Sequence, residues 1–206
     1  ELLIGVDPFK GYERLPEIIG ENQLPASVLQ DSRLRFEPHS GNQLPYPDSS
    51  FDVVLSWGSL EHIAGGYHET LSEIRRVLKP GGLLFVHPGL YYSVLGNHLG
   101  EFFDDPFIHL KVTEGELHER LLSAKPEFMD RAGYFAKPEE YWRWYKELNP
   151  ITVSQIEKEL RDMGFEPWRV ALRTADVIEY TPELQRFGMD DLAISEMYAS
   201  FVLKKD

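Results

Sequence analysis

The sequence predicts an α/β fold in which parallel strands alternate with helices, and three observations support this prediction. Residues 51–55 (FDVVL) and 83–86 (LLFV) are short apolar runs, which are typical of parallel strands buried on both faces. Between them, residues 68–79 carry apolar side chains at helical spacing on one face and charged side chains largely on the other. The PGG sequence at 80–82 is expected to end this helix. Together these segments predict a strand, a crossover helix and a second strand with a right-handed connection.

The composition is that of an ordinary globular protein. The 206 residues are 42% hydrophobic and 27% charged, which suits one domain with a sizeable core. The net charge of -13 and the absence of a dense basic run argue against nucleic acid as a partner. No apolar run approaches the roughly 20 residues of a membrane helix. The absence of cysteine excludes disulfides, thiol catalysis and cysteine-bound metal, and it is consistent with a cytoplasmic protein.

The N-terminal part of the chain adds two expected strands. Residues 2–6 (LLIGV) form an apolar run that closes on Asp7, and residues 33–37 (RLRFE) alternate as in a strand near a sheet edge. A helix is expected between them, from 12 to 19. The Asp7 carboxylate has two alternative uses. It can accept hydrogen bonds from two neighbouring hydroxyls of a ligand, or it can cap the following helix or form the turn before it.

After residue 86 the chain no longer shows strands and helices that alternate one by one. The expected helices cover residues 114–124, 139–145 and 153–163, the expected strands cover residues 165–174 and 197–203, and residues 126–138 are a turn-rich connection. We therefore expect a single domain over residues 1–206, with cap insertions at about 90–150 and 176–196. The aromatic stripe at 141–145 fits packing inside the cap better than a platform for substrate.

The stretch from 44 to 82 carries a family resemblance. It reads LPYPDSSFDVVLSWGSLEHIAGGYHETLSEIRRVLKPGG. It resembles the class I S-adenosylmethionine-dependent methyltransferases, in which an LPF-D-SFD lead-in precedes a strand, an S…LEH tip follows it, and a helix ends in VLKPGG. The resemblance implies a Rossmann-like three-layer sandwich whose sheet is mostly parallel with an antiparallel last strand. It also implies S-adenosylmethionine as the cofactor.

The resemblance assigns cofactor contacts to the ends of three strands. In the family, an acidic residue after the second strand binds the ribose, the loop after the third holds the adenine, and the fourth ends at the cofactor. The matching residues here are Asp7, Pro8, Ser40, Gly41, Asn42, Ser56, Trp57 and Gly58. The adenine loop of the family carries a carboxylate where this chain has Ser40, a weaker hydrogen-bond acceptor. A plain loop of turn residues is the alternative for that segment.

One feature of the family has no counterpart in these residues. The family places its first strand and a glycine-rich loop before the strand that ends at Asp7, and no G-x-G sequence occurs in the chain. Either the sequence is N-terminally incomplete or the chain departs from the family. In both cases two strands should lack their usual neighbour and expose apolar edges. A non-catalytic methyltransferase-like binding or assembly module is therefore an alternative to an enzyme.

A nicotinamide oxidoreductase is a second alternative, because an acid at the end of the second strand also binds ribose in that class. The fingerprint glycines of such enzymes are absent from this sequence as well. The LEH…VLKPGG stretch has no role in that class of protein. The methyltransferase interpretation therefore accounts for more of the sequence.

Histidine, aromatic and carboxylate side chains are frequent after the strand at 83–86. They suit a small polar acceptor that is hydroxylated or sugar-like, since rings cover apolar faces while imidazole and carboxylate groups bond hydroxyls. Transfer to a hydroxyl oxygen benefits from a general base, for which the candidates are His98, His109 and His62. The alternatives are a lid that packs on itself and a His62 that only holds its loop. No metal is expected, because His87, His98 and His109 lack the spacing of a ligand set.

Overall fold

The computed structural model describes residues 2–94, 96–128, 137–175 and 179–205. Its larger sheet has the order β3-β4-β6-β5, formed by β3 (Phe51–Trp57), β4 (Leu78–His87), β6 (Ile194–Leu203) and β5 (Phe165–Thr174). Strands β3 and β4 are parallel, whereas β6 is antiparallel to both of its neighbours. The prediction of an α/β fold with an antiparallel last strand is therefore confirmed.

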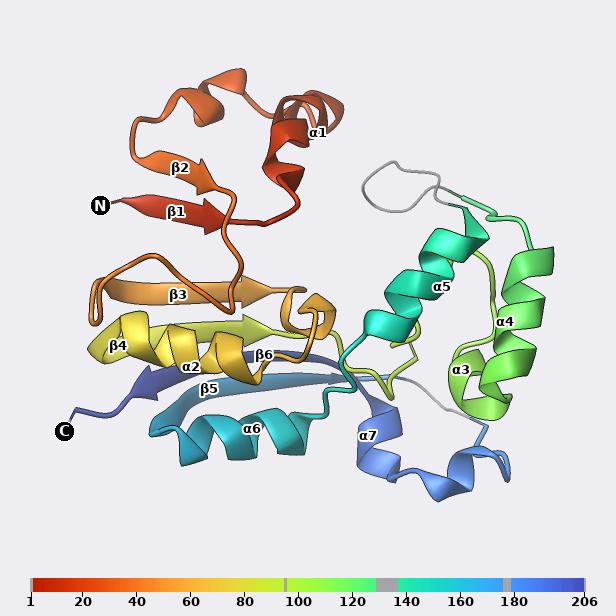
Figure 1. Ribbon diagram of the computed structural model, residues 1–206. Coiled ribbons are helices and arrows are strands. Elements are labelled where there is room, and N and C mark those ends of the chain that lie inside the picture. Colours follow the sequence, from red (N-terminus) through yellow and green to blue (C-terminus); the bar gives the residue numbers. More distant parts are fainter. Residues whose placement is uncertain (1, 95, 129–136, 176–178, 206) are drawn as a thin grey trace.

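A second sheet holds the two N-terminal strands, β1 (Leu3–Val6) and β2 (Leu34–Glu37), which are parallel. Within residues 2–94, all of which the structure describes, β1 pairs only with β2 and β3 only with β4. Figure 1 shows β1 between β2 and β3, with the arrows of all three pointing the same way. The unpaired edges of β1 and β3 therefore face each other, and Leu3 (60%) and Leu55 (71%) are exposed beside them. The expectation of two strands without a neighbour is confirmed.

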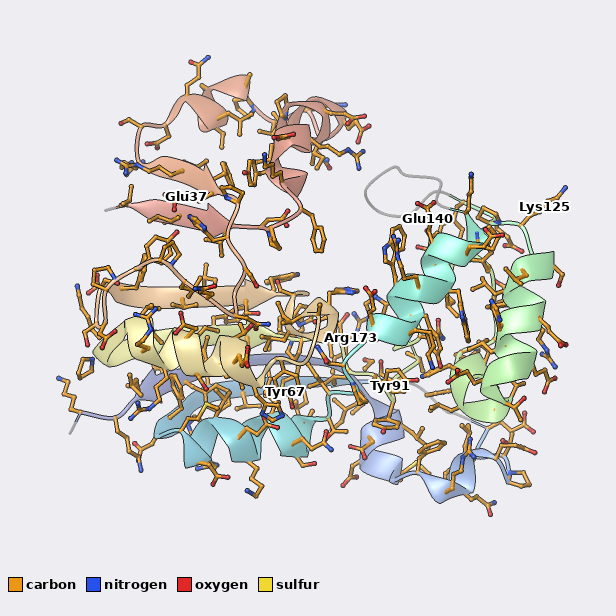
Figure 2. All side chains as sticks on the ribbon, viewed as in Figure 1. Glu37, Tyr67, Tyr91, Lys125, Glu140 and Arg173 are labelled. Carbon is orange, nitrogen blue, oxygen red and sulfur yellow. The ribbon has the colours of Figure 1, made fainter. Side chains whose placement is uncertain are left out.

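Two helices cover one face of the larger sheet, α2 (His68–Val77) and α6 (Val153–Asp162) (Figure 1). They are joined by Tyr67, whose hydroxyl donates to a carboxylate oxygen of Glu159 at 2.9 Å (Figure 2). The core between the sheet and these helices contains Leu71, Ile74, Leu84, Val86, Ile156, Leu160, Met197 and Phe201. This face follows from the alternation of β4 and β6, in which every second side chain is buried.

The opposite face of the sheet is more exposed. Register pairs Val53 with Leu83 and Leu55 with Phe85, so these four side chains point away from α2 and α6. Trp57 continues the same row and is 63% exposed. An apolar sheet face of this kind is ordinarily covered by a second layer, and strands expected to be buried on both faces are here buried on one.

The end of helix α2 differs from the expected one. The helix stops at Val77, and Leu78 is already extended and paired with Phe51 as the first residue of β4. The PGG motif at 80–82 therefore lies inside β4 as an irregularity in the pairing, with Gly81 at a φ of 81°. The expectation of a helix reaching residue 79 was wrong because strand pairing extends Leu78.

Helices near the N-terminus are shorter than expected. A 3₁₀ turn, η1 (Gly11–Arg14), precedes α1 (Leu15–Glu21), and a second 3₁₀ turn, η2 (Ala26–Gln30), leads to β2. Pro16 occupies the first turn of α1, where its missing N–H costs no hydrogen bond. Among residues 2–37, Ile19 is the only buried one.

The cap contains α3 (Ile108–Lys111), α4 (Glu114–Ser123) and α5 (Pro138–Glu147), and it packs around its own apolar cluster. Figure 1 shows these helices beyond the carboxyl ends of the parallel strands. A short helix, α7 (Met189–Ala193), precedes β6. Parts of the connection expected at 126–138 and of the insertion expected at 176–196 lie outside the described residues. None of the helices in the described ranges has the length and apolar character that a membrane span requires.

Candidate functional site

The carboxyl ends of β1, β2, β3 and β4 point to the same edge of the molecule, toward the cap (Figure 1). In open α/β sheets, ligands bind at this edge because loops rather than helices follow the strands there. The expected cofactor residues all belong to the loops and strand ends on this edge. The candidate site is therefore built on β1 to β4.

Asp7 closes the turn that follows β1. One carboxylate oxygen accepts from the backbone N–H of Phe9 at 2.9 Å, and the other accepts from that of Gly11 at 2.6 Å. A side chain at Gly11 would meet the Asp7 carboxylate at 2.8 Å, so glycine is required for this close approach. Asp7 thus forms the turn before η1, which corresponds to the second of its two alternatives. Each carboxylate oxygen keeps one further lone pair for a ligand, and Pro8 is exposed beside it.

The loop after β2 is tied to helix α2. Ser40 accepts from the backbone N–H of Asn42 at 3.2 Å, and the Asn42 side-chain oxygen accepts from the hydroxyl of Thr70. The Asn42 amide also donates to the carbonyl of Ala64 at 3.4 Å. A side chain at Gly41 would lie 3.0 Å from Thr70, so this loop sits close against the helix. The three residues form an ordered turn whose polar groups are largely engaged within the protein.

The end of β3 combines a buried polar residue with an exposed ring. Ser56 is buried, whereas the Trp57 ring lies on the open face of the sheet, 5.8 Å from Phe85 and 4.7 Å from His87 between ring centroids. Gly58 turns the chain at a φ of 57°, and its N–H donates to the carbonyl of His87 at 2.8 Å. A left-handed backbone at this position favours glycine, so the sharp exit from β3 follows from Gly58.

Glu61, His62 and His98 meet beyond the end of β3. One carboxylate oxygen of Glu61 and one ring nitrogen of each histidine all lie within 4.8 Å of one another. The rings of His62 and His98 are 4.8 Å apart at an interplanar angle of 83°. Glu61 is only 3% exposed, and its Oε1 lies 3.9 Å from Nε2 of His62. Two of the three predicted base candidates are therefore brought together, with a carboxylate that sequence reasoning had not singled out as a site residue.

Asn149 holds the 3₁₀ turn η3 (Leu60–His62) that carries this cluster. Its side-chain amide donates to the carbonyl oxygens of Leu60 at 2.8 Å and Ile63 at 2.9 Å. Its backbone N–H donates to the carbonyl of Glu61 at 2.8 Å. Sequence reasoning gave Asn149 no role in the site, because no local pattern indicates that the segment after the cap returns to the turn after β3.

His109, the third base candidate, lies inside the cap on α3. It is buried, and its Nε2 lies 2.8 Å from the carbonyl oxygen of Tyr91, to which it donates. Burial lowers the pKa of His109 to about 4, the Tyr91 hydrogen bond opposing that change only in part. Its contacts are those of a structural histidine that stays neutral near pH 7.

Tyrosines of the cap point inward. The hydroxyls of Tyr91 and Tyr145 lie 3.0 Å apart, and burial raises the pKa of Tyr145 well above its usual value. Figure 2 shows Tyr91 where the cap meets the sheet. Tyr92 packs against Phe187 with ring centroids 5.5 Å apart. This part of the cap follows the expected alternative of a lid that packs on itself.

Comparison with known proteins relates part of the chain to methyltransferases. Residues 6–86 match the family model described as methyltransferase domain. The 27-O-demethylrifamycin SV methyltransferase of Amycolatopsis mediterranei is 46% identical over 54 residues, which are 26% of this chain and 20% of that protein. The sterol 24-C-methyltransferase ERG6B of Gibberella zeae is 38% identical over 65 residues, 32% of this chain and 17% of that protein. The matched segments thus span a fifth or less of these relatives' own length.

A solved structure extends the likeness to the whole fold. A SAM-dependent methyltransferase from Methanosarcina mazei superposes with a TM-score of 0.52 at 16% identity, covering 98% of this chain and 82% of that one. At this identity the likeness is one of fold. It agrees with the mixed sheet and with the position of helices α2 and α6 described above. Residues 6–86 are therefore similar to a methyltransferase domain, and the chain shares its fold with a SAM-dependent methyltransferase.

Proposed function

We propose that this chain takes part in S-adenosylmethionine-dependent methyl transfer to an oxygen of a small hydroxylated acceptor, glycan or sugar-like in character. The observation that carries the proposal is the shared edge at which β1, β2 and β3 end, with Asp7, the turn at 40–42 and the Glu61–His62–His98 cluster on it. In folds of this class, ligands bind at that edge.

The residues present fit the nucleoside half of the cofactor. Asp7 has lone pairs left for two ribose hydroxyls, and the ordered turn at 40–42 follows β2 on the edge where an adenine ring would bind. The exit from β3 at Trp57 and Gly58 lies on the same edge. When bound, the cofactor supplies an electrophilic methyl group on a sulfonium sulfur. The contribution of this chain is to hold and orient, since methyl transfer depends mainly on alignment and exclusion of water.

The choice of an oxygen acceptor rests on the histidine pair. The side chain of His62 is partly exposed and lies beside the buried carboxylate of Glu61, at 3.9 Å. An imidazole in such a position takes up the proton that an acceptor hydroxyl loses near neutral pH. The two relatives bear names that place methyl groups on an oxygen and a carbon, respectively. Their names therefore do not select the acceptor atom, and the histidine pair supports oxygen.

We further propose a class of acceptor, a cellular compartment and a domain organisation for this chain. A net charge of -13 supports a small-molecule acceptor rather than nucleic acid, and the absence of cysteine supports the cytoplasm. We also propose one domain over residues 1–206, in which the segments at about 90–150 and 176–196 cap the site. The apolar cluster of the cap supports this arrangement.

Cofactor binding is tested by calorimetry with S-adenosylhomocysteine, the demethylated product, using the whole chain. Wild-type protein is expected to bind, and Asp7→Asn should weaken binding about tenfold or more because the charged acceptor for the ribose is lost. The matched control is Asp52→Asn. Asp52 is exposed at the amino end of β3, where it pairs with Lys79 at 2.7 Å, and its change should leave binding intact.

Two outcomes would overturn parts of the proposal. Absence of binding by folded wild-type protein supports the alternative of a non-catalytic binding or assembly module. If the cofactor binds, transfer of a labelled methyl group to hydroxylated acceptors should fall strongly in His98→Ala. Wild-type turnover in that variant would remove His98 from the reaction.

A further inference from the structure

We propose that Glu61, His62 and His98 form a binding site for a divalent transition-metal cation of the zinc type. The three side chains come from two segments, the turn η3 after β3 and the cap loop between β4 and α3. Their ligand atoms lie within 4.8 Å of one another. The proposal concerns cation binding itself and stands apart from the identity of the methyl acceptor.

The burial of Glu61 and the unpaired oxygen of its carboxylate indicate a bound cation. Its side chain is 5% exposed, and its Oε2 has no hydrogen-bond partner among the described residues. Its recorded ion contact is to His62, at 3.9 Å. A buried carboxylate with an oxygen left unpaired is costly, because the charge has lost its water without a compensating bond. A bound cation removes that cost.

Gly89 makes room for the carboxylate, and Gly58 lies at ordinary contact distance from it. A side chain at Gly89 would meet the Glu61 carboxylate at 2.7 Å, and one at Gly58 would lie 3.7 Å from it. These glycines follow β4 and β3, respectively, so the Glu61 side chain lies between the ends of two paired strands. The ends of these two strands therefore form the space that the Glu61 carboxylate occupies. Its burial does not depend on a flexible surface loop.

The backbone that carries the cluster is held in place. Three hydrogen bonds from Asn149 tie the turn at Leu60, Glu61 and Ile63. His98 lies in a left-handed backbone conformation with a φ of 53°. Such a conformation is uncommon for a residue other than glycine and occurs often where function requires it. The ligand-bearing segments are therefore ordered before any cation arrives.

The chemistry of the three groups selects the cation. Two imidazoles and one carboxylate are a ligand set of catalytic zinc sites, which keep a further position open. Imidazole favours zinc and its neighbours over magnesium or calcium, which prefer oxygen ligands alone. Tetrahedral zinc with such ligands sets their atoms about 3.3 Å apart. The present separations require closing movements of up to about 1.5 Å, and the 45% exposed side chain of His62 leaves room for them.

Sequence spacing did not reveal this cluster. The expectation of no metal considered His87, His98 and His109, of which His109 lies buried against Tyr91 and His87 stacks on Tyr198 at 4.3 Å. His98 instead meets His62, from a different segment. With a cation bound, the two imidazoles would be ligands and not bases. The acceptor hydroxyl would then be held at the open position of the cation, which would lower its pKa and so replace the imidazole base of the metal-free site.

The test is zinc titration of the whole metal-free chain, followed by calorimetry and by metal analysis after dialysis. We expect one zinc per chain with micromolar or tighter affinity. His98→Ala and Glu61→Gln should each weaken binding at least tenfold, because each removes one of three ligands. The matched control is His39→Ala, which removes an imidazole 3.3 Å from Glu37, another carboxylate, outside the cluster. That variant should bind zinc as wild type does.

Cobalt provides a second measurement. Substitution with Co²⁺ should give the visible absorption of a four-coordinate site in wild type and His39→Ala, and lose it in His98→Ala. Gly89→Ala should weaken binding while retaining all three ligands, because its methyl group displaces the Glu61 carboxylate. Thermal unfolding of the metal-free variants identifies any that fail to fold. The zinc affinities of the folded variants then test the proposed ligand set. Less than about 0.2 zinc per chain, or equal affinity in His98→Ala and His39→Ala, would overturn the proposal while leaving methyl transfer untouched.

Discussion

Asn149 and Glu61 are joined by a hydrogen bond of 2.8 Å, in which the backbone N–H of Asn149 donates to the carbonyl oxygen of Glu61. The bond connects the segment that follows the cap with the turn that follows β3. Together with the two bonds from the Asn149 side chain, it holds the backbone from which the Glu61 and His62 side chains project. A residue distant in the sequence thus positions the candidate site.

Replacement of Asn149 by alanine should destabilise the fold. The change removes the side-chain donors to Leu60 and Ile63 and leaves two carbonyl groups without their partner. We expect the free energy of unfolding to fall by about 2–3 kcal/mol, measured by urea denaturation. Asn22→Ala is the control, because its amide donates to one carbonyl, that of Ile18, at an exposed position. Its cost should stay under about 0.5 kcal/mol, and equal costs would contradict the interpretation.

His109 should make the fold sensitive to acid. Burial lowers its pKa in the folded state from 6.5 to about 4. Between these two pH values the unfolded chain binds the proton more readily, so stability is full above pH 6.5 and falls as the pH drops toward 4. The loss from this group should reach up to about 3 kcal/mol.

The measurement for His109 compares urea unfolding of wild type and His109→Gln at several pH values in that range. Glutamine retains an N–H for the Tyr91 carbonyl but does not titrate, so the variant should lose less stability in acid. His68→Gln, at a side chain that is 67% exposed, serves as the control and should follow wild type. Superimposable pH profiles for wild type and His109→Gln would refute the prediction.

The unpaired edge of β3 should promote self-association. Leu55 lies on this strand and is largely exposed, and an apolar edge strand is a template for pairing with another chain. Leu55→Lys should lower the self-associated fraction at high concentration, measured by sedimentation velocity. Its effect on unfolding should stay within about 0.5 kcal/mol, since the side chain is already exposed. Leu122→Lys, at an exposed leucine of α4, should leave association unchanged, and the same decrease there would indicate a general charge effect.

Arg76 should be a major stabiliser of the stretch from 44 to 82. Its guanidinium donates to the carbonyl oxygens of Leu44 and Tyr46 and pairs with the carboxylates of Asp48 and Glu73. A lysine cannot reproduce this fork of donors. Arg76→Lys should therefore lower the free energy of unfolding by about 1–3 kcal/mol, measured by urea denaturation.

The neighbouring arginine provides the matched control for Arg76. Arg75 makes one recorded bond, from its Nε to the carbonyl of Met163 at 2.8 Å. Arg75→Lys should cost less than about 1 kcal/mol. Equal destabilisation by the two substitutions would show that the network around Arg76 adds nothing beyond a single hydrogen bond.

Local patterns predicted most of the regular elements, and the errors have long-range causes. The periodicity of 153–163 corresponds to α6, and the apolar run at 51–55 corresponds to most of β3. The helix expected to reach residue 79 instead ends at Val77, because pairing with Phe51 extends the next residue. Strand pairing joins segments far apart in the chain, so the local sequence carries little information about it.

The site was predictable only where one segment supplies it. Asp7 was recognised as a strand-end carboxylate, and the structure shows the turn that it closes. Glu61 and His98 were not linked, since their proximity depends on how the cap returns to the sheet and on the bonds of Asn149. Burial decides the state of His109 in the same way, because no local pattern reveals which ring is enclosed.

The sequence by itself determined the α/β class, the family resemblance of the stretch from 44 to 82 and the sheet edge at which the candidate residues lie, because these follow from motifs, periodicity and turn residues within single segments. Only the tertiary structure decided that the sheet divides between β1 and β3, that His62 meets His98 and Glu61, and that His109 is enclosed. These features depend on contacts between distant segments, whose free energies are set by packing and desolvation in the folded chain.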